Sequence, residues 1–295
     1  MNRAPHTEGR DLRVATFNIR AAIGPGPFPA RWWRRCDRDR LERIAAVIGE
    51  LDADVVALQE VAVLALDGEV VDQAAQLAHL TGMAHRYGAV RTWIADEPDG
   101  VRGAGLFGNA LLARGVVAEA VVLPLPRADE ADLIETAEAD HRWAGVTWRA
   151  APPGTREPRC AVLATVDGLR VASAHLSHVG SGERLLQAQA LADSGADLVL
   201  GDLNSPLDQP AMAPFAGWTD AFAAAGIPVG DDRRRSTDDG WPIDQVLLRP
   251  GTAWQVERCA VVRTAGDASD HYPVVADLRH SSHAATDATG YPPAQ

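Results

Sequence analysis

The sequence Ser269-Asp270-His271-Tyr272-Pro273-Val274-Val275 places an acidic residue and a histidine directly before an apolar run. Four earlier apolar runs also end in polar residues, and these endings read Thr16-Phe17-Asn18, Leu58-Gln59-Glu60, Ala174-His175-Leu176 and Gly201-Asp202-Leu203-Asn204. Short apolar runs bounded by polar or turn residues are typical of buried strands. Strands that end in this way are expected to build one site.

Two stretches of the chain show the order strand, helix, strand. In the first, a strand from Arg13 to Asn18 precedes a helix from about Asp37 to Leu51 and a strand from Asp54 to Gln59. The helix is predicted from apolar residues at helical spacing, which are Leu41, Ile44, Val47 and Ile48. A strand at 168–174, a helix at about 182–193 and a strand at 197–201 repeat the order, which indicates two pseudo-equivalent halves.

The other expected elements are a helix from Asp72 to Leu80 and a series of strands. These strands are predicted at 89–94, 105–112, 116–123, 142–148, 159–166, 243–248, 255–262 and 273–278. Asp167-Gly168 is a strong turn signal, so 159–166 and 168–174 should form a hairpin. Residues 124–141 carry several acids and few apolar anchors, which favours a solvated excursion.

The length of 295 residues fits one large core, and a single domain is expected from 12 to 279. The tails 1–11 and 280–295 are polar or of low complexity and are expected to be disordered. Cys36, Cys160 and Cys259 are far apart and odd in number, so neither a disulfide framework nor a zinc spacing is indicated. A reducing, cytoplasmic location is expected. No run approaches the roughly 20 apolar residues of a membrane span, so no integral membrane association is expected.

The charge pattern restricts the partners of the protein. The net charge is −12, the pI is about 5.1 and the chain has no lysine. Proteins that follow a nucleic-acid backbone release counterions through clustered basic residues, so this composition disfavours duplex DNA. The concentrated positive charge lies at Arg31–Arg35 and Arg233–Arg235. Either cluster could bind a phosphate or stack on a ring. Alternatively, Arg31–Arg35 could be a cluster at the start of a helix, and Arg233–Arg235 could lie in a solvated loop.

The polar strand ends have the chemistry of a site for a hard cation. Mg²⁺ prefers a few oxygen ligands and keeps positions for water and phosphate. The residues that supply such oxygens are Asn18, Glu60, Asp202, Asn204 and Asp270. His175 and His271 are then expected to transfer protons or contact phosphate. His271 needs a partner that fixes its tautomer, and Asp244 is the best candidate. His178 could reach the same phosphate, but a solvated loop histidine is the favoured reading.

These motifs resemble those of the endonuclease/exonuclease/phosphatase superfamily, which includes deoxyribonuclease-I-like nucleases, sphingomyelinases and inositol-phosphate phosphatases. The resemblance runs from about Arg13 to Leu278. Its motifs are Thr16-Phe17-Asn18, Leu58-Gln59-Glu60, His175-Leu176, Gly201-Asp202-Leu203-Asn204, Ile243-Asp244 and Ser269-Asp270-His271. It implies an α/β (α+β) fold, namely a four-layered αββα sandwich of two packed mixed β-sheets flanked by helices.

The resemblance also implies a role for each site residue. Glu60 would be the main metal carboxylate, with Asn18 and Asp270 helping the metal network. Asp202 and Asn204 would position water and phosphate, and His175 would contact the scissile phosphate. His271 would be the acid/base histidine, oriented by Asp244. Asn109, in Gly108-Asn109-Ala110-Leu111-Leu112, would bind substrate.

The expected function is a Mg²⁺- or Mn²⁺-dependent hydrolase that cleaves a phosphomonoester or phosphodiester by in-line attack of water. On charge grounds a small-molecule or lipid phosphate is favoured as substrate. An endonuclease or exonuclease acting on DNA or RNA is the alternative. A non-catalytic binding module on the same fold is a third reading, which the intact set of ligands opposes. The substrate and the oligomeric state stay open.

Overall fold

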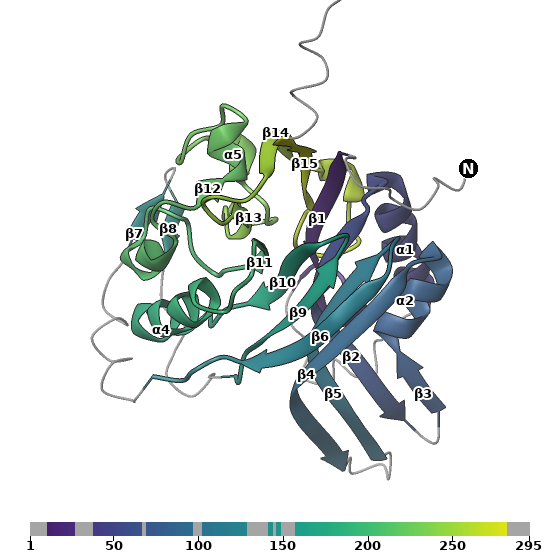
Figure 1. The fold of residues 1–295 in the computed structure, drawn as a ribbon. Helices are drawn as coiled ribbons and strands as arrows, with labels where there is room; N and C mark the ends of the chain where they lie inside the picture. The colour runs from purple at the N-terminus through teal and green to yellow at the C-terminus, as the bar shows by residue number, and fades with distance from the viewer. Residues whose placement is uncertain are drawn as a thin grey trace, which may run out of the picture.

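The computed structural model describes residues 11–26, 38–66, 69–96, 102–128, 141–143, 146–148 and 157–281 (Figure 1). The Arg31–Arg35 cluster, most of the expected excursion at 124–141 and nearly all of both expected tails lie outside these ranges. None of the helices in these ranges is long and apolar enough to cross a membrane.

The first sheet has seven strands in the order β14-β15-β1-β2-β5-β4, with β3 paired to β2. The strands are β1 (Leu12–Asn18), β2 (Val55–Leu66), β3 (Glu69–Asp72), β4 (Ala84–Asp96), β5 (Arg102–Ala113), β14 (Trp254–Val261) and β15 (Val274–His280). β1 runs parallel to β2, and β15 runs antiparallel to β1. The end of β1, the Gln59-Glu60 part of β2 and the start of β15 therefore lie side by side.

The second sheet has six strands in the order β12-β13-β11-β10-β9-β6. The strands are β6 (Val117–Pro124), β9 (Cys160–Val166), β10 (Leu169–His175), β11 (Leu198–Asp202), β12 (Thr219–Asp220) and β13 (Asp244–Leu248). β10 and β11 are parallel, with His175 opposite Asp202, and β13 is antiparallel to β11, with Asp244 opposite Asp202. Three predicted site residues thus lie in adjacent register positions.

Helices cover the outer faces of the two sheets (Figure 1). α1 (Arg38–Leu51) and α2 (Gln73–Thr81) pack on the first sheet, while α4 (Ser181–Ala192) and the 3-10 helix η3 (Pro210–Phe215) pack on the second. The core between the sheets includes Val14 and Val55 from one side and Val171 and Leu200 from the other. The predicted four-layered αββα sandwich is confirmed. Both predicted strand-helix-strand units are present, as β1-α1-β2 and β10-α4-β11.

A chain of buried polar side chains joins the two sheets. Gln59 Oε1 accepts a hydrogen bond from the Thr16 hydroxyl (3.1 Å), and Gln59 Nε2 donates to Ser173 Oγ on the second sheet (3.4 Å). The Ser173 hydroxyl donates to the Leu58 carbonyl (3.2 Å). Because unpaired buried polar groups are costly, these bonds resist sliding of one sheet over the other. They lie one or two residues from the candidate residues Asn18, Glu60 and His175.

Several elements differ from the predictions. β2 continues past Gln59 to Leu66 because a bulge, rather than a strand end, falls between Leu58 and Val61. The stretch predicted as one strand at 142–148 forms a hairpin of β7 (His141–Trp143) and β8 (Val146–Trp148), and β3 was not predicted. The predicted Asp167-Gly168 turn is confirmed, with φ of 49° and 78° at its two residues.

Parts of the expected excursion and of the expected C-terminal tail belong to the packed structure. Residues 125–128 belong to the packed structure, since Leu125 and Ala128 are buried. The Leu125 N–H donates to the Arg159 carbonyl (2.9 Å), and the Ala128 N–H donates to Glu183 Oε2 (3.1 Å). At the other end of the chain, β15 reaches His280. In both stretches, hydrogen bonds to residues that are distant in sequence satisfy the backbone, and the local composition does not reveal these partners.

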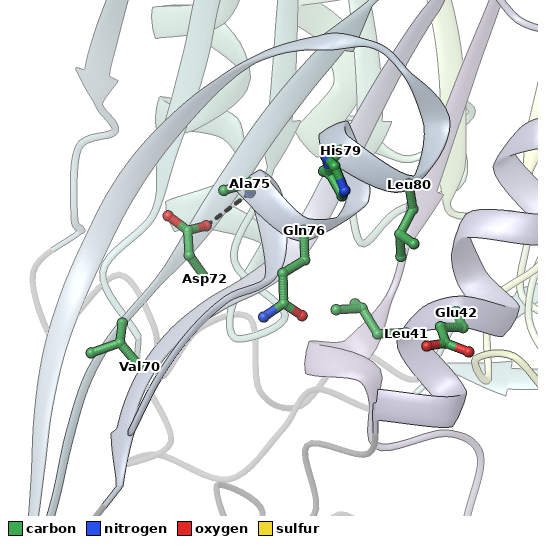
Figure 2. A pocket seen from close by; sticks show the side chains of 8 residues that line it. All are labelled: Leu41, Glu42, Val70, Asp72, Ala75, Gln76, His79 and Leu80. Carbon is green, nitrogen blue, oxygen red and sulfur yellow. Dashed lines mark hydrogen bonds between the residues drawn. The ribbon is translucent and has the colours of Figure 1, made fainter. Parts of the chain in front are cut away.

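A cavity of about 390 Å³ lies among α1, β3 and α2 (Figure 2). Its lining residues are Leu41, Glu42, Val70, Asp72, Ala75, Gln76, His79 and Leu80. Asp72 caps α2, because its Oδ1 accepts a hydrogen bond from the Ala75 N–H (3.0 Å). None of the predicted site residues lines this cavity, so the strand-end site must be sought elsewhere.

Candidate active site

Most of the predicted site residues meet at the seam between the two sheets. The link across the seam is Asn18, at the end of β1. Its Nδ2 donates to Glu60 Oε1 (2.9 Å) and to Asp202 Oδ2 (3.1 Å), and its Oδ1 accepts from the Arg20 N–H (3.0 Å). One buried amide therefore holds a carboxylate from each sheet, and as placed it acts as a hydrogen-bond donor toward both.

Glu60 is aimed at this amide by an unusual backbone conformation. Its φ is 55°, in the left-handed region, at the bulge between Leu58 and Val61. A bulge of this kind re-aims a side chain that a regular strand would direct elsewhere. Burial raises the pKa of Glu60; the hydrogen bond from Asn18 opposes that rise, and the charge of Asp270 adds to it. The carboxylate is thus held where a cation would stabilise its charged form.

Asp202 ends β11 and is almost fully buried. Its Oδ1 accepts from the Asn204 N–H (2.9 Å), and Asn204 has a φ of 50° and donates from Nδ2 to the Leu176 carbonyl (2.9 Å). This is an Asx turn, a conformation that suits the spacing of the two residues. Burial raises the pKa of Asp202 to about 7.

His271 and Asp244 form the predicted pair. His271 Nδ1 lies 2.8 Å from Asp244 Oδ2, which also accepts from the Ser236 hydroxyl (2.7 Å). Burial alone would lower the pKa of His271, but the Asp244 charge and hydrogen bond outweigh it, so the pKa is raised well above its ordinary value. The other ring nitrogen, Nε2, lies 3.7 Å from Asp202 Oδ2. His271 therefore lies between two carboxylates, with Asp244 at Nδ1 and Asp202 at Nε2.

His175 approaches the same carboxylate from the other side, with its Nε2 3.4 Å from Asp202 Oδ2. Its Nδ1 lies 3.1 Å from Nη1 of Arg159, a buried residue just before β9. Burial and the nearby Arg159 charge lower the pKa of His175 well below its ordinary value. The two site histidines thus have opposite partners and opposite pKa shifts.

His178 is not a solvated loop histidine, so that expectation is wrong. It is half-buried, and its Nδ1 lies 2.9 Å from Nη2 of Arg159. Burial and the Arg159 charge lower its pKa to about 4. His178 is part of the structure around the site, because it contacts the buried Arg159.

Asp270 lies next to His271 and pairs with a residue that the sequence did not reveal. Its Oδ2 is 3.1 Å from Nε of Arg20, a buried residue just after β1. Arg20, Ala21 and Ala22 have φ values of 49°, 49° and 58°, an uncommon run of left-handed residues. The Ser269 hydroxyl donates to the Asn18 carbonyl (2.8 Å), which fixes the Asp270 segment against β1.

Asn109 lies apart from this network. It is buried on β5, and its Nδ2 donates to the Cys160 carbonyl at the start of β9 (2.7 Å). The bond joins the two sheets, and no recorded contact links Asn109 to the other predicted site residues within the described ranges. Its predicted role in binding substrate stays a prediction.

The arginines at 233–235 form ion pairs with aspartates. Arg233 pairs with Asp231 (2.6 Å), Arg235 pairs with Asp232 (2.8 Å), and the buried Arg234 pairs with Asp220. Arg234 also lies over the Phe222 ring, 4.9 Å from its centroid. These contacts favour a structural role over a grip on phosphate.

The donor set fits a hard divalent cation. Asp202, Asp244 and His271 each place one possible ligand atom within 4.8 Å of the others, and Glu60 and Asp270 add further carboxylates. Asp244 Oδ1 is buried and has no hydrogen-bond partner among the described residues. Oxygen-rich sets of this kind suit Mg²⁺ or Mn²⁺, and the carboxylates are close enough to need compensating positive charge.

Arg159 and Arg20 are the important residues that sequence reasoning missed. Arg159 stands at the start of the strand that is antiparallel to β10, with Ala161 opposite Ala174. A charged residue directly before an apolar strand, next to the strand that ends in His175, was the available signal. For Arg20 the signal was weaker, because its role depends on a backbone turn that local sequence does not indicate.

Comparisons with known proteins agree with this architecture. A sequence model of the endonuclease/exonuclease/phosphatase family matches residues 15–271. No curated protein matches the chain. Among solved structures, an endonuclease/exonuclease/phosphatase protein from Beutenbergia cavernae is 26% identical, with a TM-score of 0.65, and the match covers 92% of this chain and 72% of that one.

Two better-described proteins share the fold at lower identity. The human Nocturnin catalytic domain with bound sulfate is 16% identical, with a TM-score of 0.59 and coverage of 92% and 93% of the two chains. D. rerio TDP2 complexed with a single-strand DNA product is 15% identical, with a TM-score of 0.54 and coverage of 91% and 99%. At these identities the likeness shows the fold alone.

Proposed function

Because the chain belongs to the endonuclease/exonuclease/phosphatase family, whose members are hydrolases acting on phosphoesters, we propose that it is a divalent-metal-dependent hydrolase of phosphate esters. The observation that carries the proposal is the Asp244–His271 pair. Nε2 of His271 lies 3.7 Å from Asp202 Oδ2. Asp202 also accepts a hydrogen bond from the Asn18 amide, which donates to Glu60 as well. A proton carrier, a buried carboxylate and cation ligands converge at one place.

Glu60 and Asp270 would hold Mg²⁺ or Mn²⁺, with Asn18 and Arg20 fixing their positions. When bound, the cation would polarise the phosphoryl oxygens and offset the negative charge that develops during the reaction. The raised pKa of Glu60 fits this role. Burial makes the charged carboxylate unfavourable, and a bound cation would offset that cost and keep the carboxylate ionised.

In the proposed reaction a water oxygen attacks phosphorus, one P–O bond forms, and the P–O bond to the alcohol breaks. Asp202 takes the proton from water, for which a pKa of about 7 is well matched near neutral pH. His271 gives its proton to the departing alkoxide, and Asp244 stabilises the imidazolium before transfer. Asp202 can then return a proton to His271 across the 3.7 Å contact, so the site is restored.

A small-molecule or lipid phosphate is the substrate class that the charge distribution favours. The net charge is −12, and the arginines at 233–235 are paired with aspartates. A groove that follows a nucleic-acid backbone needs free cations. Cleavage of DNA or RNA is the alternative outcome of the substrate test below. The cytoplasmic location stays a prediction, which cell fractionation would check.

The test is a panel of phosphate monoesters, lipid phosphodiesters and labelled oligonucleotides, assayed with Mg²⁺, Mn²⁺ and a chelator. Glu60→Gln should lower turnover about 10²-fold or more while the protein stays folded. Glu257→Gln is the matched control, because Glu257 pairs with Arg279 on β14 and β15 outside the site. Hydrolysis that is unaffected by chelator, or equal loss in both variants, would contradict the proposal.

A further inference from the structure

Arg159 lies between two histidines and contacts the same atom on each. Its Nη1 is 3.1 Å from His175 Nδ1, and its Nη2 is 2.9 Å from His178 Nδ1. The residue is only 5% exposed, and its Nε is buried with no hydrogen-bond partner in the described part of the chain. Glu157 Oε2 lies 3.7 Å from Nη1.

The chemistry of a guanidinium group decides which tautomer these rings adopt. A guanidinium group has five N–H donors and no acceptor, so a nitrogen that it contacts must offer a lone pair. Both Nδ1 atoms therefore lack hydrogen, and each neutral ring carries its hydrogen on Nε2. In His271 the contact is reversed, because Nδ1 faces the acceptor Oδ2 of Asp244 and must donate.

We propose that Arg159 is a positioning residue that holds His175 in the Nε2–H tautomer. The Nε2–H then points to the Asp202 side of the site, 3.4 Å from Oδ2, where a phosphoryl oxygen could accept it. His175 donates a hydrogen bond and does not carry a proton between reactants. Proton transfer is left to His271. The assignment of these roles rests on the proposed function, whereas the tautomer itself does not.

The fold holds Arg159 in this place from several directions. Ala161 on β9 is opposite Ala174 on β10, so the residue that precedes β9 is brought next to His175 at the end of β10. The Arg159 carbonyl accepts a hydrogen bond from the Leu125 N–H (2.9 Å). Because His175 contacts Nη1 and His178 contacts Nη2, both terminal nitrogens of the planar guanidinium group are held in place.

A direct contact between Arg159 and substrate phosphate is the competing role. The geometry opposes it, since both Nη atoms are directed at ring nitrogens and Nε is shielded from solvent. The two roles predict different results for the tautomer of His175, for KM and for the combination of variants.

The primary test is an NMR measurement on the metal-free, ¹⁵N-labelled protein. Long-range ¹H–¹⁵N correlations distinguish a ring nitrogen that bears hydrogen from one that does not, and His175→Gln and His178→Gln assign the signals. We expect Nε2–H rings at His175 and His178 and hydrogen on Nδ1 at His271. A wild-type His175 with hydrogen on Nδ1 would overturn the proposal, whatever the protein hydrolyses.

Variants at position 159 test the cause. Arg159→Met removes both contacts and should give a mixture of tautomers at His175, whereas Arg159→Lys has one nitrogen and should retain one contact. The matched control is Arg249→Met, which removes hydrogen bonds to the Ala196 and Ala192 carbonyls (2.6 and 2.8 Å) and a contact with the Trp218 ring. A His175 tautomer unchanged in folded Arg159→Met, or changed equally by Arg249→Met, would refute the positioning role.

Kinetics provide the second readout. If Arg159 acts through His175, Arg159→Met should lower kcat about 10- to 100-fold with little change in KM, and the same change made in a His175→Gln background should cost almost nothing more. A large rise in KM, or losses that multiply, would show direct binding of phosphate instead. If no phosphate ester is hydrolysed, the proposed function fails, while the NMR result still decides the tautomer.

Discussion

Removing the charge of Asp244 should slow the proposed reaction mainly through His271, with a smaller effect on Asp202, whose pKa is raised by burial and also by the Asp244 charge. Asp244 Oδ2 is shared between His271 Nδ1 (2.8 Å) and the Ser236 hydroxyl (2.7 Å), so His271 is its hydrogen-bonded link to the reacting groups. Acid–base catalysis by a positioned side chain contributes about 10²- to 10⁴-fold. We expect His271→Ala to lower kcat about 10³-fold, which is roughly 4 kcal/mol of transition-state stabilisation. Asp244→Asn keeps a hydrogen-bonding side chain and should lower kcat about 10²-fold, roughly 3 kcal/mol.

The double variant and the pH profile distinguish a coupled pair from two independent residues. Independent effects would multiply to about 10⁵-fold, whereas a coupled pair should lose only the roughly 10³-fold of His271→Ala. Asp244 raises the pKa of His271, so Asp244→Asn should lower that pKa and move the alkaline limb of the kcat profile to lower pH. Asp277→Asn, which breaks an ion pair with Arg13 on the first sheet, is the control for an acid-to-amide change. Multiplicative losses with an unmoved limb would refute the reasoning.

Three further outcomes are expected. Burial raises the pKa of Asp202 from its ordinary value near 4 to about 7, so its protonated form favours the folded state. The metal-free protein should therefore lose thermal stability as the pH rises from about 4 to about 7, and Mg²⁺ should restore part of that loss; a flat profile would contradict the buried charge. Ser173→Ala should cost about 1–3 kcal/mol in urea unfolding, because Gln59 Nε2 loses its partner between the sheets, and a cost near zero would show that water replaces it. Binding to single- or double-stranded DNA should be weak at physiological salt, and tight binding with a steep salt dependence would favour the nuclease alternative.

The predictions from sequence succeeded where the information is local. Apolar spacing from Leu41 to Ile48 was sufficient for α1, and Asp167-Gly168 was sufficient for the hairpin between β9 and β10. The meeting of strand ends followed from the order of elements, because parallel neighbours place their ends at one edge. This order brought Asn18 and His175 to the seam.

The errors arose where the structure depends on contacts that are distant in sequence. Glu60 ended the predicted strand because a polar residue there resembles a strand end, whereas in the fold it stands at a bulge within β2. His178 was read as a solvated loop residue because its partner, Arg159, stands before β9 and is distant in sequence. The sequence leaves the role of Arg234 open between phosphate binding, ring stacking and a solvated loop, because its partners Asp220 and Phe222, which bury it, are not adjacent in sequence.

The pairing of β15 with β1 sets when the site can first exist during synthesis. During synthesis β1 and β2 are made early. The other edge of β1 stays unpaired until β15 is made, because β1 pairs there with β15 and Thr16 lies opposite Val274. His271 arrives in the same late segment. A nascent chain therefore contains Glu60 and Asp202 before it contains His271, the proposed proton carrier. An open strand edge also favours wrong pairing, so we expect the chain to be most prone to misfold between the synthesis of β1 and that of β15.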